Sequence, residues 1–201
     1  MVYSCFSTII YYFNFYFLLV RITKVTTKIG DKGQTNLGDG SFVSKSSYRV
    51  CAFGSIDNLN SFIGWVSVIS SSRLQDKLKK IQQDLFNIGG ELSLPNKNLN
   101  LIKMNRLEWL ESEINNVNKK LPPLKEFILP SGSELCTRIH IARTECRNAE
   151  RDLVRLSENE EIPSLHNKYL NRLSDYLFVL ARSIQLKSNE KEIHWNHKKI
   201  K

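Results

Sequence analysis

The chain has 201 residues, of which 41% are hydrophobic and 24% are charged. This length fits one ordinary domain, and this composition excludes both a disordered chain and a polytopic membrane protein. The 29 lysine and arginine residues outnumber the 20 aspartate and glutamate residues, and the resulting net charge of +9 favours partners that carry phosphate groups.

Residues 1–20 contain no charged side chain and are rich in Phe, Tyr and Leu. This is close to the length that a helix needs to cross a bilayer, but Asn14 and several hydroxyl side chains weaken that interpretation. The segment shows neither the basic start and small-residue cleavage site of a secretory leader nor the scattered Arg and Ser of a mitochondrial leader clearly. For residues 1–23, a membrane anchor, a leader and a non-functional extension therefore remain open, and membrane contact is expected only through residues 1–20.

Residues 24–48 are polar and contain four of the nine glycines, which predicts a loop outside the core. Glycines let backbone N–H groups approach an anion closely, and Lys28, Lys32 and Lys45 supply positive charge, so a phosphate-binding loop is one interpretation. The residues after Gly38 exclude a Walker motif, and the absence of a third glycine excludes a Rossmann fingerprint. A flexible surface loop is the alternative.

After this segment, apolar residues recur at steps of three and four, which predicts five helices. The apolar runs cover residues 52–66, 78–92, 107–117, 135–156 and 170–184. Ser133 is expected to cap the fourth helix, and Pro122-Pro123 ends the third. We therefore expect an all-α, up-and-down five-helix bundle with an extended N-terminal loop, followed by a basic, loosely held tail over residues 188–201.

The fourth predicted helix places Arg143, Arg147, Glu150 and Arg151 on one face. Guanidinium groups bind phosphate oxygens in a bidentate manner, and Glu150 suits a hydrated Mg²⁺. A solvated face with local ion pairs is the alternative. No spacing of His or Cys residues indicates a metal site, and the four cysteines without a CxxC pair favour a reducing compartment, either the cytoplasm or the mitochondrial matrix.

Five ordered segments carry a family resemblance. They are TKIGDKGQT (27–35), AFGSIDNLNSFIG (52–64), FILPSGSEL (127–135), HIARTECRNAER (140–151) and NRLSDYLFVLAR (171–182). Together they resemble the trimeric, PduO-type ATP:cob(I)alamin adenosyltransferases over residues 24–195, which leaves residues 196–201 as a basic tail. The resemblance implies a homotrimer with ATP between neighbouring subunits. It also implies transfer of the 5′-deoxyadenosyl group of ATP to the cobalt of cob(I)alamin, giving adenosylcobalamin and triphosphate.

The resemblance also implies roles for individual residues. Arg147 and Phe127 are implied to be catalytic, with Phe127 displacing the lower axial ligand of cobalamin. Asp57 and Arg143 are implied to join subunits by a salt bridge. Besides Phe127, the residues implied to bind substrates are Thr27, Lys28, Ile29, Gly30, Thr35, Asn36, Lys45, Arg147, Asn148, Ala149, Glu150, Arg151 and Asn171. Mg²⁺ on the ATP, a reductase and an adenosylcobalamin-dependent enzyme are the further partners.

The sequence departs from the family pattern at Ile29, Asn58, Ser131 and Asn148, where Thr, Glu, Gly and Arg are typical. The loss of a positive charge at Asn148 is expected to weaken ATP binding by about 1.5–3 kcal/mol if that group made a charged hydrogen bond. Two other functions are weighed. A nucleotide-binding bundle without catalysis is one. A basic nucleic-acid-binding module is the other, but the interleaved aromatic residues of a stacking platform are missing, so no nucleic-acid partner is expected.

Overall fold

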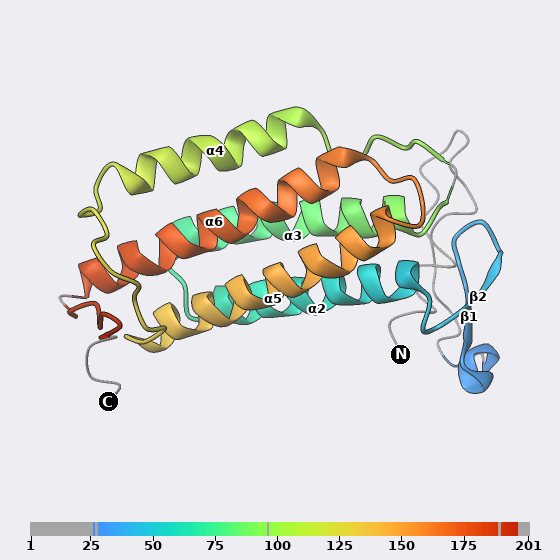
Figure 1. Ribbon diagram of the computed structural model, residues 1–201, viewed down its shortest axis with the longest axis horizontal. Coiled ribbons are helices and arrows are strands. Elements are labelled where there is room, and N and C mark those ends of the chain that lie inside the picture. The colour runs from blue at the N-terminus through green and yellow to red at the C-terminus, as the bar shows by residue number, and fades with distance from the viewer. Residues whose placement is uncertain (1–25, 27, 96, 189, 197–201) are drawn as a thin grey trace.

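The structure is a computed structural model that describes residue 26 and residues 28–95, 97–188 and 190–196. Five α-helices in this part of the chain lie lengthwise beside one another (Figure 1), which confirms the predicted all-α bundle. They are α2 (Tyr48–Val68), α3 (Ser72–Leu92), α4 (Met104–Asn118), α5 (Glu134–Ser157) and α6 (Ser164–Lys187). The predictions for residues 1–23, Thr27 and 197–201 lie outside the described residues.

The core lies where α2, α5 and α6 meet, with α3 packed on α2 and α4 packed on α6. The apolar positions spaced by three and four form one buried face on each helix, as helical geometry requires. Fully buried examples are Leu59, Ile63, Leu78, Ile81, Ile139, Cys146, Leu153, Leu173 and Leu177. No helix in the described part of the chain is long and apolar enough to cross a membrane.

The start of α5 is set by its cap and by a glycine. The Ser133 side chain accepts a hydrogen bond from the backbone N–H of Cys136 at 3.3 Å, which confirms the predicted cap. Gly132 adopts a φ of 106°, which is unfavourable for any residue with a Cβ, and a Cβ there would also lie 3.1 Å from Gln185. The departure at Ser131 therefore leaves the glycine that the turn requires in place.

The glycine-rich segment is more ordered than predicted. It forms a 3-10 helix, η1 (Ile29–Lys32), and an antiparallel hairpin of β1 (Gln34–Asn36) and β2 (Phe42–Ser44). Leu37 joins the hydrophobic core, and the backbone N–H of Gly38 donates to the carbonyl of Ser93 at 2.7 Å. The prediction of a loop outside the core was wrong here, because strands of three residues are too short to show a clear alternation.

The segment after α6 is also held more firmly than predicted. The backbone N–H of Leu129 donates to the carbonyl of Ile193 at 2.8 Å, and that of Trp195 donates to the carbonyl of Phe127 at 2.7 Å. Nearby, Arg182 forms an ion pair with Glu192 at 2.7 Å. The expectation of a loose tail is therefore wrong for residues 190–195, which line the loop that carries Phe127.

Candidate active site

The glycine-rich segment presents two lysines beside a tight backbone turn. Lys28 adopts a left-handed conformation with a φ of 59°, and its side chain is exposed. The Lys45 Nζ donates to the carbonyl of Gly30 at 2.9 Å. A Cβ on residue 30 would lie 2.7 Å from that Nζ, so a larger residue there would push the lysine side chain aside. The turn thus holds an ammonium group beside exposed backbone, an arrangement suited to an anion.

The remaining residues implied in this segment differ in accessibility. Thr35 pairs with Val43 in the hairpin and is only 7% exposed. Asn36 is half-buried. Thr27 lies outside the described residues, as does the side chain of Ile29.

The arginine face of α5 contains Arg147 and Arg151, both exposed. The Arg151 Nη2 donates to the Oδ1 of Asn148, which fixes the direction of the guanidinium group. Glu150 lies between these two arginines in the sequence, and its Oε1 accepts a hydrogen bond from the Nδ2 of Asn171 on α6 at 2.9 Å. The structure therefore brings the polar residues predicted on α5 and α6 together on one surface.

Ala149 is the exception among the residues implied to bind substrates. Its side chain is completely buried and belongs to the hydrophobic core between the helices. A methyl group enclosed in this way offers no surface to a ligand. The 3.6-residue period turns this side chain away from Arg147 and Arg151 and into the packing between the helices.

Two of the departures from the family pattern meet at one carboxylate. The Glu145 Oε2 accepts hydrogen bonds from Asn58 on α2 at 2.9 Å and from Asn148 at 3.2 Å. Because its amide nitrogen is turned to Glu145, Asn148 directs its oxygen toward Arg151. The residue that lacks the expected positive charge thus holds a neighbouring arginine in position.

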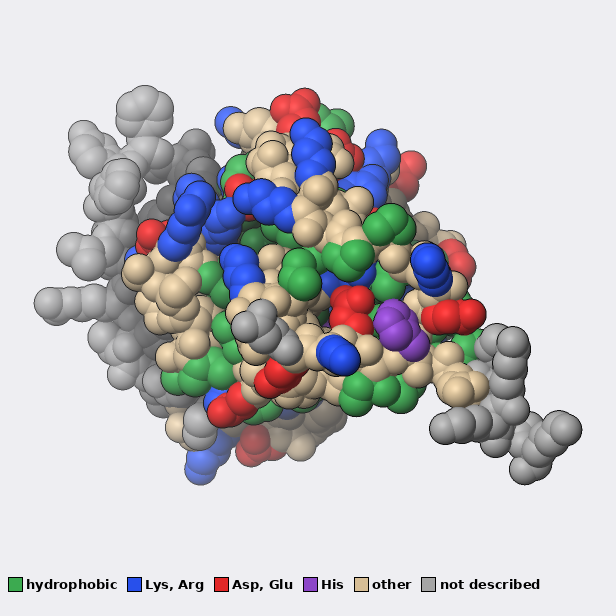
Figure 2. All heavy atoms as spheres, turned by 90° about the vertical axis from the view of Figure 1, so that its left-hand side faces the viewer, with side chains coloured by type: hydrophobic (Ala, Val, Ile, Leu, Met, Phe, Trp, Pro, Cys, Tyr) green, Lys and Arg blue, Asp and Glu red, His purple; other side chains and the backbone are tan. Residues whose placement is uncertain are grey.

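The loop before α5 exposes apolar side chains at one end of the bundle. Phe127 is 77% exposed, and its ring centroid lies 6.2 Å from that of Trp195. The other large hydrophobic residues exposed here are Leu124, Leu129 and Ile193. Figure 2, which looks at this end, shows hydrophobic side chains lying between charged ones. Such a patch indicates a binding surface for an apolar ligand or partner.

A cavity of about 480 Å³, which we call the Phe127 pocket, lies beneath this loop. It is lined by residues 124–128 and Pro130 of the loop, by His140 and Arg143 of α5 and by Phe178 of α6. Burial, reinforced by the charge of Arg143, lowers the pKa of His140 to about 4. The Arg143 guanidinium lies 6.0 Å from the Phe178 ring centroid. Burial, together with the charge of Arg147, lowers the pKa of Arg143. The wall of the pocket thus combines apolar side chains with Lys125, Glu126, His140 and Arg143.

Asp57 of α2 and Arg143 of α5 do not pair with each other within the described residues. Burial raises the pKa of the Asp57 carboxyl. In the part of the chain that the structure describes, the Arg143 Nε is buried without a hydrogen-bond partner. Among these residues, each side chain is therefore partly desolvated without an opposite charge that would compensate it.

Comparisons with known proteins identify the family. A family model described as "Cobalamin adenosyltransferase" matches residues 25–184. The chain belongs to the cobalamin adenosyltransferase family. It is 42% identical over 181 residues to a cobalamin adenosyltransferase of Cupriavidus metallidurans, covering 89% of this chain and 97% of that protein. It is 40% identical over 183 residues to a corrinoid adenosyltransferase of Bacillus subtilis, covering 88% and 94%.

Solved structures of the family share the fold. A variant of the PduO-type ATP:corrinoid adenosyltransferase from Lactobacillus reuteri, complexed with cobalamin and ATP, superposes with a TM-score of 0.83 at 35% identity. The match covers 87% of this chain and 100% of that chain. A second variant, complexed with ATP, gives a TM-score of 0.80 at 36% identity, covering 86% and 100%. The family likeness thus extends over nearly the whole described bundle.

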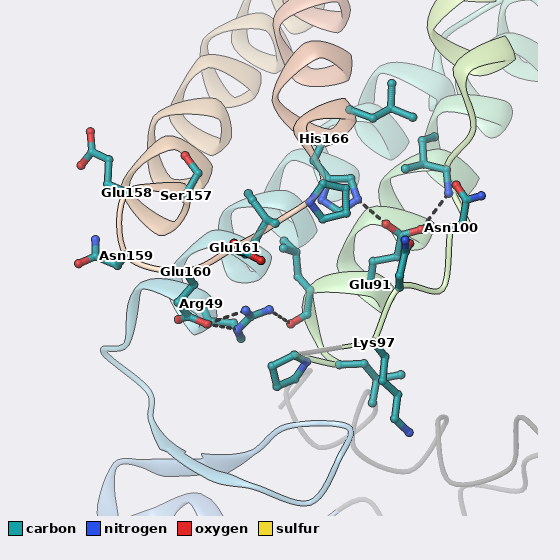
Figure 3. Close-up of a pocket in the computed structure, with 18 residues that line it drawn as sticks. Arg49, Glu91, Lys97, Asn100, Ser157, Glu158, Asn159, Glu160, Glu161 and His166 are labelled. Carbon is teal, nitrogen blue, oxygen red and sulfur yellow. Dashed lines mark hydrogen bonds and ion pairs between the residues drawn. The ribbon is translucent and has the colours of Figure 1, made fainter.

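A second cavity, of about 960 Å³, lies at the other end of the bundle (Figure 3). Two ion pairs that sequence reasoning missed stand in its wall. Arg49 donates to the Glu160 carboxylate at 2.6 and 2.9 Å and to the carbonyl of Leu92 at 2.7 Å. The other pair joins Glu91 to His166 at 2.5 Å. The first pair ties the loop after α5 to the start of α2, and the second joins the end of α3 to the start of α6.

Glu91 is the centre of this second wall. Its other oxygen, Oε1, accepts hydrogen bonds from the backbone N–H groups of Leu101 and Ile102. Burial acts to raise the pKa of Glu91, but the hydrogen bond and charge of His166 and the two N–H groups outweigh it and lower the pKa. The Nδ1 of His166 is buried without a hydrogen-bond partner among the described residues. The other polar groups here are paired with one another, so we assign them to fold stability. The sequence signal that could have revealed these pairs was a charged residue, Glu91, beside the apolar stripe of α3.

Proposed function

We propose that this chain transfers the 5′-deoxyadenosyl group of ATP to the cobalt of cob(I)alamin, giving adenosylcobalamin and triphosphate. The observation that carries this proposal is the single face of α5 that runs from the Phe127 pocket through Arg147 to Arg151. At 1.5 Å of rise per residue, the step from Arg143 to Arg151 spans roughly 12 Å. That length suits a ribose and its phosphates with the sugar end at the pocket. The relatives complexed with cobalamin and ATP support the same pair of substrates.

The phosphate end of this face is built from charged hydrogen-bond donors. Arg147 and Arg151 are exposed and can each grip phosphate oxygens through two parallel N–H groups. Lys28 and Lys45 add charge from the glycine-rich segment, together with the backbone around Gly30. These groups stabilise the charge that develops on the departing triphosphate.

Mg²⁺ enters this site with the triphosphate. No group of three or more His, Cys, Asp or Glu side chains in the described residues is arranged to hold a metal ion. Glu150, oriented by Asn171, offers one carboxylate beside the arginines, which suits an ion that keeps its waters and takes its other ligands from phosphates. When bound, the ion neutralises charge on the phosphate oxygens.

The corrinoid end requires an apolar surface. The Co(I) centre attacks C5′ of the ribose with its electron pair. The Co–C bond forms as the C5′–O bond breaks, and triphosphate leaves with the electrons of that bond. No general base is needed, so the protein contributes alignment and exclusion of water. Phe127 presents its exposed ring to the lower face of the corrin, where it displaces the axial ligand and makes the preceding Co(II) state easier to reduce.

We further propose that the working enzyme is a homotrimer with its active sites between subunits. The raised pKa of Asp57 and the unpartnered Nε of Arg143 support this, because each would gain an opposite charge across an interface. Pairing there would place a subunit boundary along the face of α5 that carries Arg147. The neighbouring subunit would then help to enclose the substrates.

The reaction also implies partners on either side of it. A reductase must deliver the electron that converts Co(II) to Co(I), and an adenosylcobalamin-dependent enzyme must receive the product. We place the enzyme in a reducing compartment, the cytoplasm or the mitochondrial matrix, where the free thiols of Cys51, Cys136 and Cys146 are maintained.

The test is an anaerobic assay with MgATP and chemically reduced cobalamin, followed by the absorbance change that accompanies Co–C bond formation. We expect Arg147→Ala to lower kcat/KM about 10- to 100-fold, as the loss of a charged hydrogen bond to phosphate requires. Arg155→Ala is the matched control, because Arg155 lies two turns further along α5 and pairs with Asp152. Absence of product with the unmodified chain would contradict the proposal, and steeply salt-dependent retention of DNA would instead support a nucleic-acid-binding module.

A further inference from the structure

Four polar side chains form a line of hydrogen bonds that starts on α2 and continues along α5. The Nδ2 of Asn58 donates to the Oε2 of Glu145 at 2.9 Å, and the Nδ2 of Asn148 donates to the same oxygen at 3.2 Å. The Oδ1 of Asn148 then accepts a hydrogen bond from the Nη2 of Arg151. The exposed guanidinium of Arg151 is thus connected, through two side chains of α5, to a residue on another helix.

The two neighbours of residue 148 favour an amide at that position. The carboxylate of Glu145 only accepts hydrogen bonds, and the guanidinium of Arg151 only donates them. An asparagine between them donates to the first and accepts from the second without adding a charge. An arginine there would repel Arg151, and an aspartate would repel Glu145. Asn148 therefore orients Arg151 through a neutral acceptor, so the positive charge of the guanidinium stays available to a phosphate.

The residue at position 58 is matched to the residue at position 148. In the family pattern a glutamate and an arginine stand at these two positions, and their charges sum to zero. Two amides leave that sum unchanged. A glutamate at position 58 alone would bring a second negative charge to the Glu145 carboxylate, with no arginine at position 148 to offset it. The two departures from the family pattern therefore form one coupled change around Glu145.

We propose that Asn148 and Asn58 are coupled positioning residues for the triphosphate, which act through Glu145 to hold Arg151 in the direction that meets phosphate oxygens. This inference rests on the proposed function and deepens it by naming residues that set the affinity of its phosphate subsite. A side chain that is held in advance loses less conformational freedom when it binds a ligand. Asn148 thus supports ATP binding without contributing a charge of its own.

The experiment measures the equilibrium binding of MgATP, and of inorganic triphosphate as a second probe, in the absence of a corrinoid. We expect Asn148→Ala to weaken the binding of both probes about 3- to 10-fold, and Asn58→Ala about 2- to 3-fold. The double variant should bind about as well as Asn148→Ala alone, because both residues act through one path. Asn116→Ala is the matched control, since it removes an exposed amide from α4, which packs on α6.

Conservative variants at position 148 separate positioning from a structural role. Asn148→Gln keeps a donor and an acceptor and should recover most of the affinity for triphosphate. Asn148→Asp keeps the shape and the acceptor but loses the donor, so it should not recover that affinity. The KM for cob(I)alamin should stay within about twofold in every variant, because Arg151 is assigned to the phosphates.

Three results would overturn the inference. They are an unchanged triphosphate affinity in Asn148→Ala, losses that multiply in the double variant, and an equal rise in the KM for cob(I)alamin. An unmodified chain that binds MgATP and triphosphate but forms no adenosylcobalamin would instead overturn the proposed reaction alone.

Discussion

Replacing Glu91 with alanine tests how the end of the bundle opposite the Phe127 pocket is held together. The Glu91 side chain is 4% exposed and serves the ring of His166 and the N–H groups of Leu101 and Ile102. Removing the carboxylate leaves these three groups buried without a partner. A stranded member of a buried ion pair costs about 3–5 kcal/mol, so we expect the free energy of unfolding to fall by about that amount. Glu91→Gln keeps an acceptor oxygen and should cost less, about 1–3 kcal/mol.

Urea unfolding at one fixed protein concentration measures this loss. Arg155→Ala is the matched control, because the Arg155 side chain is exposed and pairs with Asp152 within α5, so its loss should cost less than about 1 kcal/mol. The pKa of Glu91 is lowered in the folded state from its usual 4.5, so its contribution is present above that pH and is lost as the pH falls through the folded-state pKa. A neutral-pH loss below about 1 kcal/mol, or a loss that grows on acidification, would refute this reasoning.

Three further predictions concern the substrate-binding end and the thiols. Phe127→Ala should keep the Tm and the KM for ATP, since the ring is 77% exposed, but should slow adenosylcobalamin formation; equal turnover would remove its proposed role. Asp57→Arg and Arg143→Asp should each shift the chain toward monomers in sedimentation velocity, and the double variant should restore the trimer; single variants that stay trimeric would contradict the salt bridge. Exposed Cys51 should react with a thiol reagent well before Cys136, whose pKa burial raises to about 11, and the reverse order would be inconsistent with the structure.

The helices could be predicted because each presents a continuous apolar stripe to one shared core. Along α5, the spacing of Ile139, Ala142, Cys146 and Leu153 is that of a helix with one buried face, and all four side chains are completely buried. The hairpin of β1 and β2 gave no comparable signal. Its place in the core depends on Leu37 and on a backbone contact with Ser93, which lies far along the chain.

The candidate site was predictable only in part. A helical period places Arg147 and Arg151 on one face, and the structure agrees, but the family motif alone did not reveal that Ala149 points into the core. The contacts of Asn148 with Glu145 and Arg151 depend on side-chain directions that spacing does not fix. Buried ion pairs such as Glu91 with His166 were missed because their partners come from distant segments, so neither residue is distinctive alone.

The most direct test of the account is an experimental structure of the chain with MgATP and cob(II)alamin bound. We predict a trimer in which the triphosphate contacts Arg147 and Arg151, the corrin lies on Phe127, and C5′ of the ribose faces the cobalt. Phosphates bound away from α5, or a corrin that leaves the Phe127 pocket empty, would contradict the claim that one helix face aligns both substrates.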